Sequence, residues 1–133
     1  MMRLRSDLLD LLEATARGNL AGVTPEWRDE AALTVVMATQ GYPVGVVAKG
    51  SEIKGVEGLD NDHVRIFQAG TRREGEHLLA NGGRVLNVTA LGRTVAAARE
   101  AAYAAVDRID WPQGFFRRDI GWRAIAREKE NQS

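Results

Sequence analysis

Two groups of residues in this 133-residue sequence combine side chains that could bind an anion. The first group is Gly70-Thr71-Arg72 together with Asn81-Gly82-Gly83-Arg84. Backbone amides of a glycine turn, a hydroxyl group and a guanidinium can together hold a phosphate or a carboxylate. Spacing alone favours a simpler interpretation, two hairpin turns with solvent-facing arginines, because an Asn-Gly turn needs no function to explain it.

The second group is Arg117-Arg118-Asp119, which follows two phenylalanines. Adjacent arginines on a strand point to opposite faces. One of them could therefore reach a ligand or a neighbouring domain, while the other meets Asp119 or solvent. The alternative, which spacing favours, is a surface ion pair beside a core aromatic residue.

Most other kinds of catalytic site are excluded or not expected, and no catalytic residue is assigned. The sequence has no cysteine, which rules out disulfides, thiolate zinc sites and cysteine nucleophiles. The only histidines, His63 and His77, fall in different predicted strands, and no metal site is expected within this chain. The segment from Gly45 to Ser51 has the glycine spacing of a phosphate-binding loop but lacks its lysine, and we reject it.

Charge composition excludes two further classes of binder. The 18 basic residues balance 18 acidic ones, and a neutral chain is a poor non-specific ligand for nucleic acid or a membrane surface. All basic residues except Lys49, Lys54 and Lys129 are arginines, which bind carboxylates and phosphates through a planar fork. No apolar run is long enough for a signal peptide or a membrane span, so a cytoplasmic protein is expected.

The sequence pattern predicts an α+β domain that would position these groups. Apolar spacing predicts an amphipathic helix over residues 4–17, ended by Gly18, whose leucine face must dock on this chain or on a neighbour. Thr24-Pro25-Glu26 indicates the start of a second helix. The clearest helix spans residues 93–109 with Thr94 as its N-cap.

The remaining segments read as strands and turns. Strands are predicted at residues 33–38, 63–69, 76–80, 84–91 and 115–120, with a long loop at 44–62 and a turn at 72–75. Asn81-Gly82-Gly83 is typical of a type I′ hairpin turn. Because helices and strands do not alternate regularly, we expect a mostly antiparallel sheet with flanking helices.

Five motifs in register carry a resemblance to a known family. They are Gly41-Tyr42-Pro43, Ala69-Gly70-Thr71, Asn81 to Leu86, Val88 to Gly92, and Arg117 to Gly121. In this order and spacing they resemble the C-terminal region of the phosphoribosylamine–glycine ligases, also called glycinamide ribonucleotide synthetases. The sequence departs from the family pattern at Gln68, where histidine is frequent, and after Pro43.

The resemblance implies part of an ATP-grasp ligase of de novo purine biosynthesis. Such an enzyme uses ATP with Mg²⁺ or Mn²⁺ to join glycine to 5-phosphoribosylamine. On this resemblance residues 1–31 form a helical segment continuing from an ATP-grasp domain, 32–126 form the C-terminal α+β domain, and 127–133 form a frayed tail. The N-terminal and ATP-grasp domains would be partners outside this chain, and the isolated chain would bind no cofactor and be inactive.

The resemblance also implies candidate residues for the wall of the substrate site. Asn81, Gly82, Gly83 and Arg84 are the leading candidates, followed by Thr71, Arg118 and Asp119. Two alternatives remain open: a stand-alone module that binds a phosphorylated metabolite or a partner protein, and a domain that only braces the ATP-grasp core. The exposed leucine face of the first helix further predicts self-association of this chain.

Overall fold

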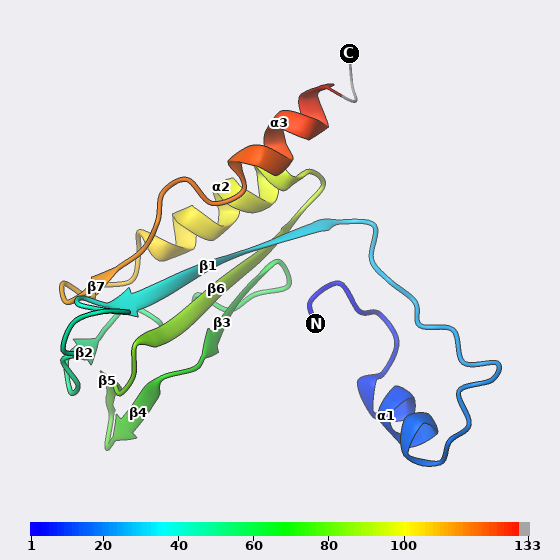
Figure 1. Cartoon of the computed structure of the whole chain (residues 1–133), viewed down its shortest axis with the longest axis horizontal. Coiled ribbons are helices and arrows are strands. Elements are labelled where there is room, and N and C mark those ends of the chain that lie inside the picture. The colour runs from blue at the N-terminus through cyan, green and yellow to red at the C-terminus, as the bar shows by residue number, and fades with distance from the viewer. Residues whose placement is uncertain (131–133) are drawn as a thin grey trace.

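The computed structural model describes residues 1–130 and contains two antiparallel sheets and three helices. The elements in chain order are α1 (Leu8–Ala16), β1 (Ala31–Thr39), β2 (Glu52–Ile53), β3 (Val64–Gln68), β4 (Thr71–Glu74), β5 (His77–Ala80), β6 (Arg84–Gly92), α2 (Val95–Val106), β7 (Gly114–Phe115) and α3 (Trp122–Glu130). In Figure 1, α2 lies along the larger sheet, and α1 stands apart from both. The predicted α+β class with antiparallel strands is confirmed.

The larger sheet has the strand order β3-β6-β1-β7, and alternation along its strands separates two faces. On the inner face Leu33, Val35 and Met37 stand opposite Ala90, Val88 and Leu86 of β6. All six side chains are buried beneath α2. On the outer face, neighbours such as Thr34 and Thr89 pair through their hydroxyl groups at 2.8 Å. Hydrophobic burial therefore fixes the register, because a slip of one residue would turn the apolar set to the outside.

Helix α2 packs closely against the inner face because the residues at the contact are small. Ala98 and Ala102 are fully buried against the sheet. A Cβ at Gly92, the last residue of β6, would overlap the backbone of Ala97 and Ala98. The Thr94 side chain caps the helix by accepting a hydrogen bond from the Ala97 amide at 3.1 Å, as predicted.

The smaller sheet shows that one turn was predicted in the wrong place. Its strand order is β2-β5-β4, and β4 with β5 forms a hairpin whose turn is Gly75-Glu76, with Gly75 at φ +59°. Residues 72–74, predicted as a turn, belong to β4. The predicted hairpin at Asn81-Gly82-Gly83 is also wrong, because β5 and β6 belong to different sheets. This segment carries the chain from the smaller sheet to the larger one.

The first thirty residues form an arm rather than two consecutive helices. Helix α1 is shorter than predicted and begins after Asp7, whose carboxylate accepts a hydrogen bond from the Leu9 amide at 2.7 Å. It ends at Ala16, and the predicted stop residue Gly18 follows the C-cap Arg17 with φ +65°. Residues 3–5 instead pair with residues 26–28: the Arg28 amide donates to the Arg3 carbonyl at 2.7 Å. The helix predicted from Thr24 is therefore wrong, because this segment is held extended.

The C-terminal part differs from the expectation in one strand and one helix. Only Gly114–Phe115 pairs with β1, and the rest of the predicted strand 115–120 is a loop that leads into α3. The Glu128 carboxylate of α3 accepts hydrogen bonds from the Val95 amide, at 2.8 and 3.0 Å, and so caps the first turn of α2. Residues 127–130 of the predicted frayed tail are helical, and residues 131–133 lie outside the described residues.

No helix within residues 1–130 is both long and apolar enough to cross a membrane.

Candidate functional site

The first predicted anion-binding group comes together where three chain segments meet. The Asn81 amide donates to the Gly70 carbonyl at 2.7 Å, and the Thr39 amide donates to the Gly83 carbonyl at 2.8 Å. The Thr39 hydroxyl adds a hydrogen bond to the Gly82 carbonyl, also at 2.8 Å. We call Gly70, Gly82 and Gly83 the glycine junction. It adjoins the point where the pairing of β1 with β6 shifts register, between Met37 and Ala38.

The glycines of the junction are required because neighbouring atoms leave no room for a Cβ. A Cβ at Gly70 would lie 2.6 Å from the Arg84 carbonyl oxygen and 3.0 Å from the Cα of Gly82. A Cβ at Gly83 would overlap the ring of Tyr42. Neither Gly82 nor Gly83 is among the described glycines with positive φ, so the conformation of a type I′ turn is absent here.

Two polar side chains lie exposed beside the junction. Asn81 and Arg84 are exposed, and neither side chain makes a hydrogen bond or ion pair with any residue in the range 1–130. Thr71 is half-buried, and its hydroxyl donates to the Gln68 Oε1 at 3.0 Å. The junction therefore presents an amide and a guanidinium at its surface, with the Thr71 hydroxyl already engaged.

The second predicted group is engaged in contacts within the domain. The Arg118 guanidinium forms a bidentate pair with the Asp107 carboxylate, at 3.1 and 2.6 Å, and lowers the pKa of that carboxyl. Arg117 pairs in the same way with Asp119 and lowers its pKa. Because residues 117–119 form a loop, the prediction that a strand sends Arg117 and Arg118 to opposite faces is wrong.

Helix α2 holds this loop in place. The Tyr103 hydroxyl donates to the Arg117 carbonyl at 2.5 Å and accepts from the Ile120 amide at 3.3 Å. Arg99 donates to the carbonyls of Ile120 and Arg118, at 3.0 and 2.6 Å. In the part of the chain that the structure describes, no hydrogen bond or ion pair joins Arg118 or Asp119 to the glycine junction.

One histidine has a partner that the sequence does not reveal. His77 Nδ1 lies 2.6 Å from Glu52 Oε1, across the pairing of β2 with β5. This contact and the Lys54 ammonium, 3.1 Å from Glu52 Oε2, lower the pKa of the Glu52 carboxyl. Residues 1–130 contain no cluster of three or more histidines, aspartates or glutamates that could hold a metal ion.

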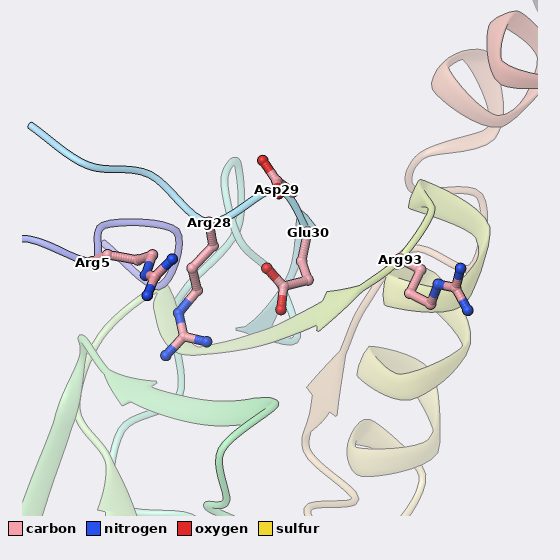
Figure 2. Close-up of a pocket in the computed structure, with 5 residues that line it drawn as sticks. All are labelled: Arg5, Arg28, Asp29, Glu30 and Arg93. Atoms are coloured by element: carbon pink, nitrogen blue, oxygen red, sulfur yellow. The ribbon is translucent and has the colours of Figure 1, made fainter.

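A cavity lined by charged residues was missed by the sequence analysis. It has a volume of about 570 Å³ and is lined by Arg5, Arg28, Asp29, Glu30 and Arg93 (Figure 2). These residues come from the arm, the entry to β1 and the end of β6. The excess of arginine was the only signal in the sequence, since nothing local indicates that residues 5, 28 and 93 meet.

A second cavity, of about 480 Å³, lies over the outer face of the larger sheet. Met1, Met2 and Trp27 of the arm face Ala32, Thr34, Phe67, Asn87 and Thr89 of the sheet. Trp27 and Phe67 remain 55% and 41% exposed, so the arm covers this face only in part.

Comparison with known proteins places the fold in a family. Residues 32–123 match the model of the phosphoribosylglycinamide synthetase C domain. The chain belongs to this family. The matched range includes both sheets, α2, the glycine junction and the loop at residues 117–119.

Similar proteins are much longer than this chain. It is 63% identical to a phosphoribosylamine–glycine ligase from Mesorhizobium japonicum over 97% of this chain and 30% of that protein. It is 50% identical to the chloroplastic phosphoribosylamine–glycine ligase of Arabidopsis thaliana over 98% of this chain and 25% of that protein. The crystal structure of phosphoribosylamine–glycine ligase from Thermotoga maritima superposes with a TM-score of 0.62 at 32% identity, covering 82% of this chain and 27% of that chain. The chain thus spans less than a third of the length of these relatives.

Proposed function

We propose that this chain acts as the C-terminal part of a phosphoribosylamine–glycine ligase. The single observation that carries the proposal is the 63% identity to a protein of that name over nearly the whole chain. The reaction is the ATP-dependent joining of glycine to 5-phosphoribosylamine, in de novo purine biosynthesis. Activation of the glycine carboxylate as an acyl phosphate, followed by attack of the amine, gives glycinamide ribonucleotide, ADP and phosphate. The proposal places the enzyme in the cytoplasm.

The described residues support a role in substrate binding rather than in phosphoryl transfer. They offer no cluster of carboxylates or histidines for a metal ion, so the proposal assigns ATP and Mg²⁺ or Mn²⁺ to the N-terminal and ATP-grasp domains of the complete enzyme. An acyl phosphate must be kept from water until the amine attacks it. A domain that packs beside the ATP-grasp core and walls the substrate site serves this requirement.

Within this domain, Asn81 and Arg84 are proposed as the leading candidates to contact the substrate. Both are exposed and unpaired among residues 1–130, and the close-packed backbone of Gly82 and Gly83 fixes the segment between them. Arg84 can donate to a carboxylate or phosphate through its fork. Thr71, Arg118 and Asp119 come second, because each would have to exchange an existing hydrogen bond or ion pair to reach a ligand.

A chimera tests this proposal directly. The chain replaces the corresponding C-terminal region of the Mesorhizobium japonicum ligase, and formation of ADP that depends on glycine and phosphoribosylamine is measured. We expect the chimera to be active and the isolated chain to be inactive. In the chimera, Arg84→Ala is expected to lower kcat/KM by about tenfold or more, since it removes a charged hydrogen bond. Arg127→Ala, an exposed arginine of α3, is the matched control and should leave kcat/KM unchanged.

Two results would contradict parts of the proposal. An inactive chimera, alongside a parent enzyme that stays active when cut and rejoined at the same position, would overturn the assignment of function. An active chimera whose kcat and KM are unaffected by Arg84→Ala would leave the domain with a bracing role and remove Arg84 from the substrate site.

A further inference from the structure

Three arginine side chains that line the charged cavity have no partner among the described residues. The guanidinium groups of Arg5, Arg28 and Arg93 make no hydrogen bond or ion pair with any residue from 1 to 130. Arg99, Arg117 and Arg118, by contrast, are all bound to carbonyl or carboxylate oxygens. Guanidinium groups gathered at one cavity without oxygen partners leave their donors free for a ligand.

The backbone of the arm holds two of these arginines close together. The Arg5 amide donates to the Glu26 carbonyl at 2.9 Å, and the Arg28 amide donates to the Arg3 carbonyl at 2.7 Å. The Arg3 guanidinium also donates hydrogen bonds to the Arg28 carbonyl, at 3.0 and 3.3 Å. Arg5 and Arg28 therefore lie on two segments fixed to each other, which reduces the ordering that a ligand must impose.

The cavity also has two carboxylates, and their placement limits the ligand. Asp29 and Glu30 line it, so its net charge with the three arginines is one positive unit. In Figure 2 the Asp29 carboxylate points away from the guanidinium groups of Arg5 and Arg28. Glu30 lies between those two groups and Arg93, which stands at the other end of the view. The site therefore suits one compact anionic group at the end held by Arg5 and Arg28.

We infer that this cavity binds a phosphate group, either free phosphate or a phosphate monoester. Arg5 and Arg28 donate to its oxygens from the arm, and Arg93 adds positive charge from the end of β6. Phosphate matches the fork of a guanidinium and has enough oxygens for more than one arginine. The volume of about 570 Å³ accommodates the organic part of a small monoester as well.

Amide NMR spectra of the chain test the inference. Inorganic phosphate is titrated at constant ionic strength, and glycerol 3-phosphate is titrated in a second series. We expect saturable shifts at the amides near residues 5, 28 and 93. Arg28→Gln should raise the apparent Kd by about tenfold, the effect of losing one hydrogen bond to a charged group, and Arg93→Gln should raise it less because it removes only positive charge. Arg127→Gln is the matched control, and each variant's spectrum shows whether it is folded.

The outcomes separate the two sources of phosphate and can refute the site. Equal affinity for the two probes indicates a site for the phosphate group alone, and tighter binding of glycerol 3-phosphate indicates a monoester. Shifts that do not saturate, or an equal loss in Arg28→Gln and Arg127→Gln, would overturn the inference. Saturable shifts confined to the glycine junction would also overturn it. Because the readout is binding to the isolated chain, the result does not depend on the ligase activity proposed above.

Discussion

At the scale of single residues, the glycine junction shows that a position can require glycine because there is no room for a Cβ, and not because the backbone has a positive φ. Gly70 and Gly82 approach each other backbone to backbone, and Gly83 lies under the Tyr42 ring. Asn-Gly in a sequence predicts positive φ because two-residue hairpins are its commonest setting. Here the same residues allow two sheets to join closely, and they leave Asn81 and Arg84 at the surface.

Gly83→Ala is expected to destabilise the domain by about 1–3 kcal/mol, the range for forcing an extra methyl group into a packed site. The physical reason is overlap of the new Cβ with the Tyr42 ring. Urea unfolding of the chain followed by circular dichroism measures the free energy of unfolding. The control is the same substitution in a Tyr42→Ala background, where the ring is gone and the cost should shrink. Equal costs in both backgrounds would show that the ring is not the obstacle.

At the scale of elements, the parts set by local pattern were predicted and the parts set by distant partners were not. The N-cap of α2 and the glycine stop of α1 depend on neighbouring residues, and both were confirmed. The helix expected from Thr24 had good start signals, but residues 26–28 pair with residues 3–5 instead. Helix α3 was missed because it is mostly charged, and its Glu128 caps a helix more than thirty residues earlier.

The same limit applies to the candidate site. Sequence reasoning brought Gly70 and Asn81-Gly82-Gly83 together correctly, because they flank one hairpin and its exit. It could not show that Arg118 is bound to Asp107, since spacing gave it Asp119 as the nearer acid. Nor could it group Arg5, Arg28 and Arg93, which the arm and β6 bring to one cavity from distant parts of the chain.

The contact between α2 and the loop before α3 gives a prediction at this scale. Tyr103→Phe removes a hydroxyl that both donates to the Arg117 carbonyl and accepts from the Ile120 amide. The expected loss is about 1–3 kcal/mol of unfolding free energy, because two partly buried backbone groups lose their partner. Hydrogen exchange at the Ile120 amide should also become faster.

Tyr42→Phe is the matched control for this substitution. Its hydroxyl has no hydrogen-bond partner within residues 1–130, so its removal should change the unfolding free energy by no more than about 0.5 kcal/mol. If Tyr103→Phe were equally neutral and the exchange of Ile120 unchanged, the side chain of Arg99 alone would be sufficient to hold the loop.

At the scale of the whole molecule, a buried core and an exposed arm are joined in one chain. The core lies between the inner face of the larger sheet and α2. The arm has no buried residue in α1, and Leu8, Leu9 and Leu12 are 39%, 69% and 56% exposed. Contact with the rest of the described chain leaves most of this leucine face exposed. Apolar area of this kind on a helix is typical of a surface that meets another protein.

Self-association of the isolated chain remains our prediction for this helix, and the structure sharpens which residues it requires. Leu9 and Leu12 are the most exposed leucines of α1, whereas Leu11 is half-buried. Sedimentation velocity over a wide range of protein concentration should show a mass that rises above 14.6 kDa. The double substitution Leu9→Glu and Leu12→Glu should restore a monomer, because charged side chains are costly to bury unpaired. Asn19→Glu, which adds charge beside α1 without removing apolar area, should not. A wild-type chain that stays monomeric throughout would show that this face needs a different partner.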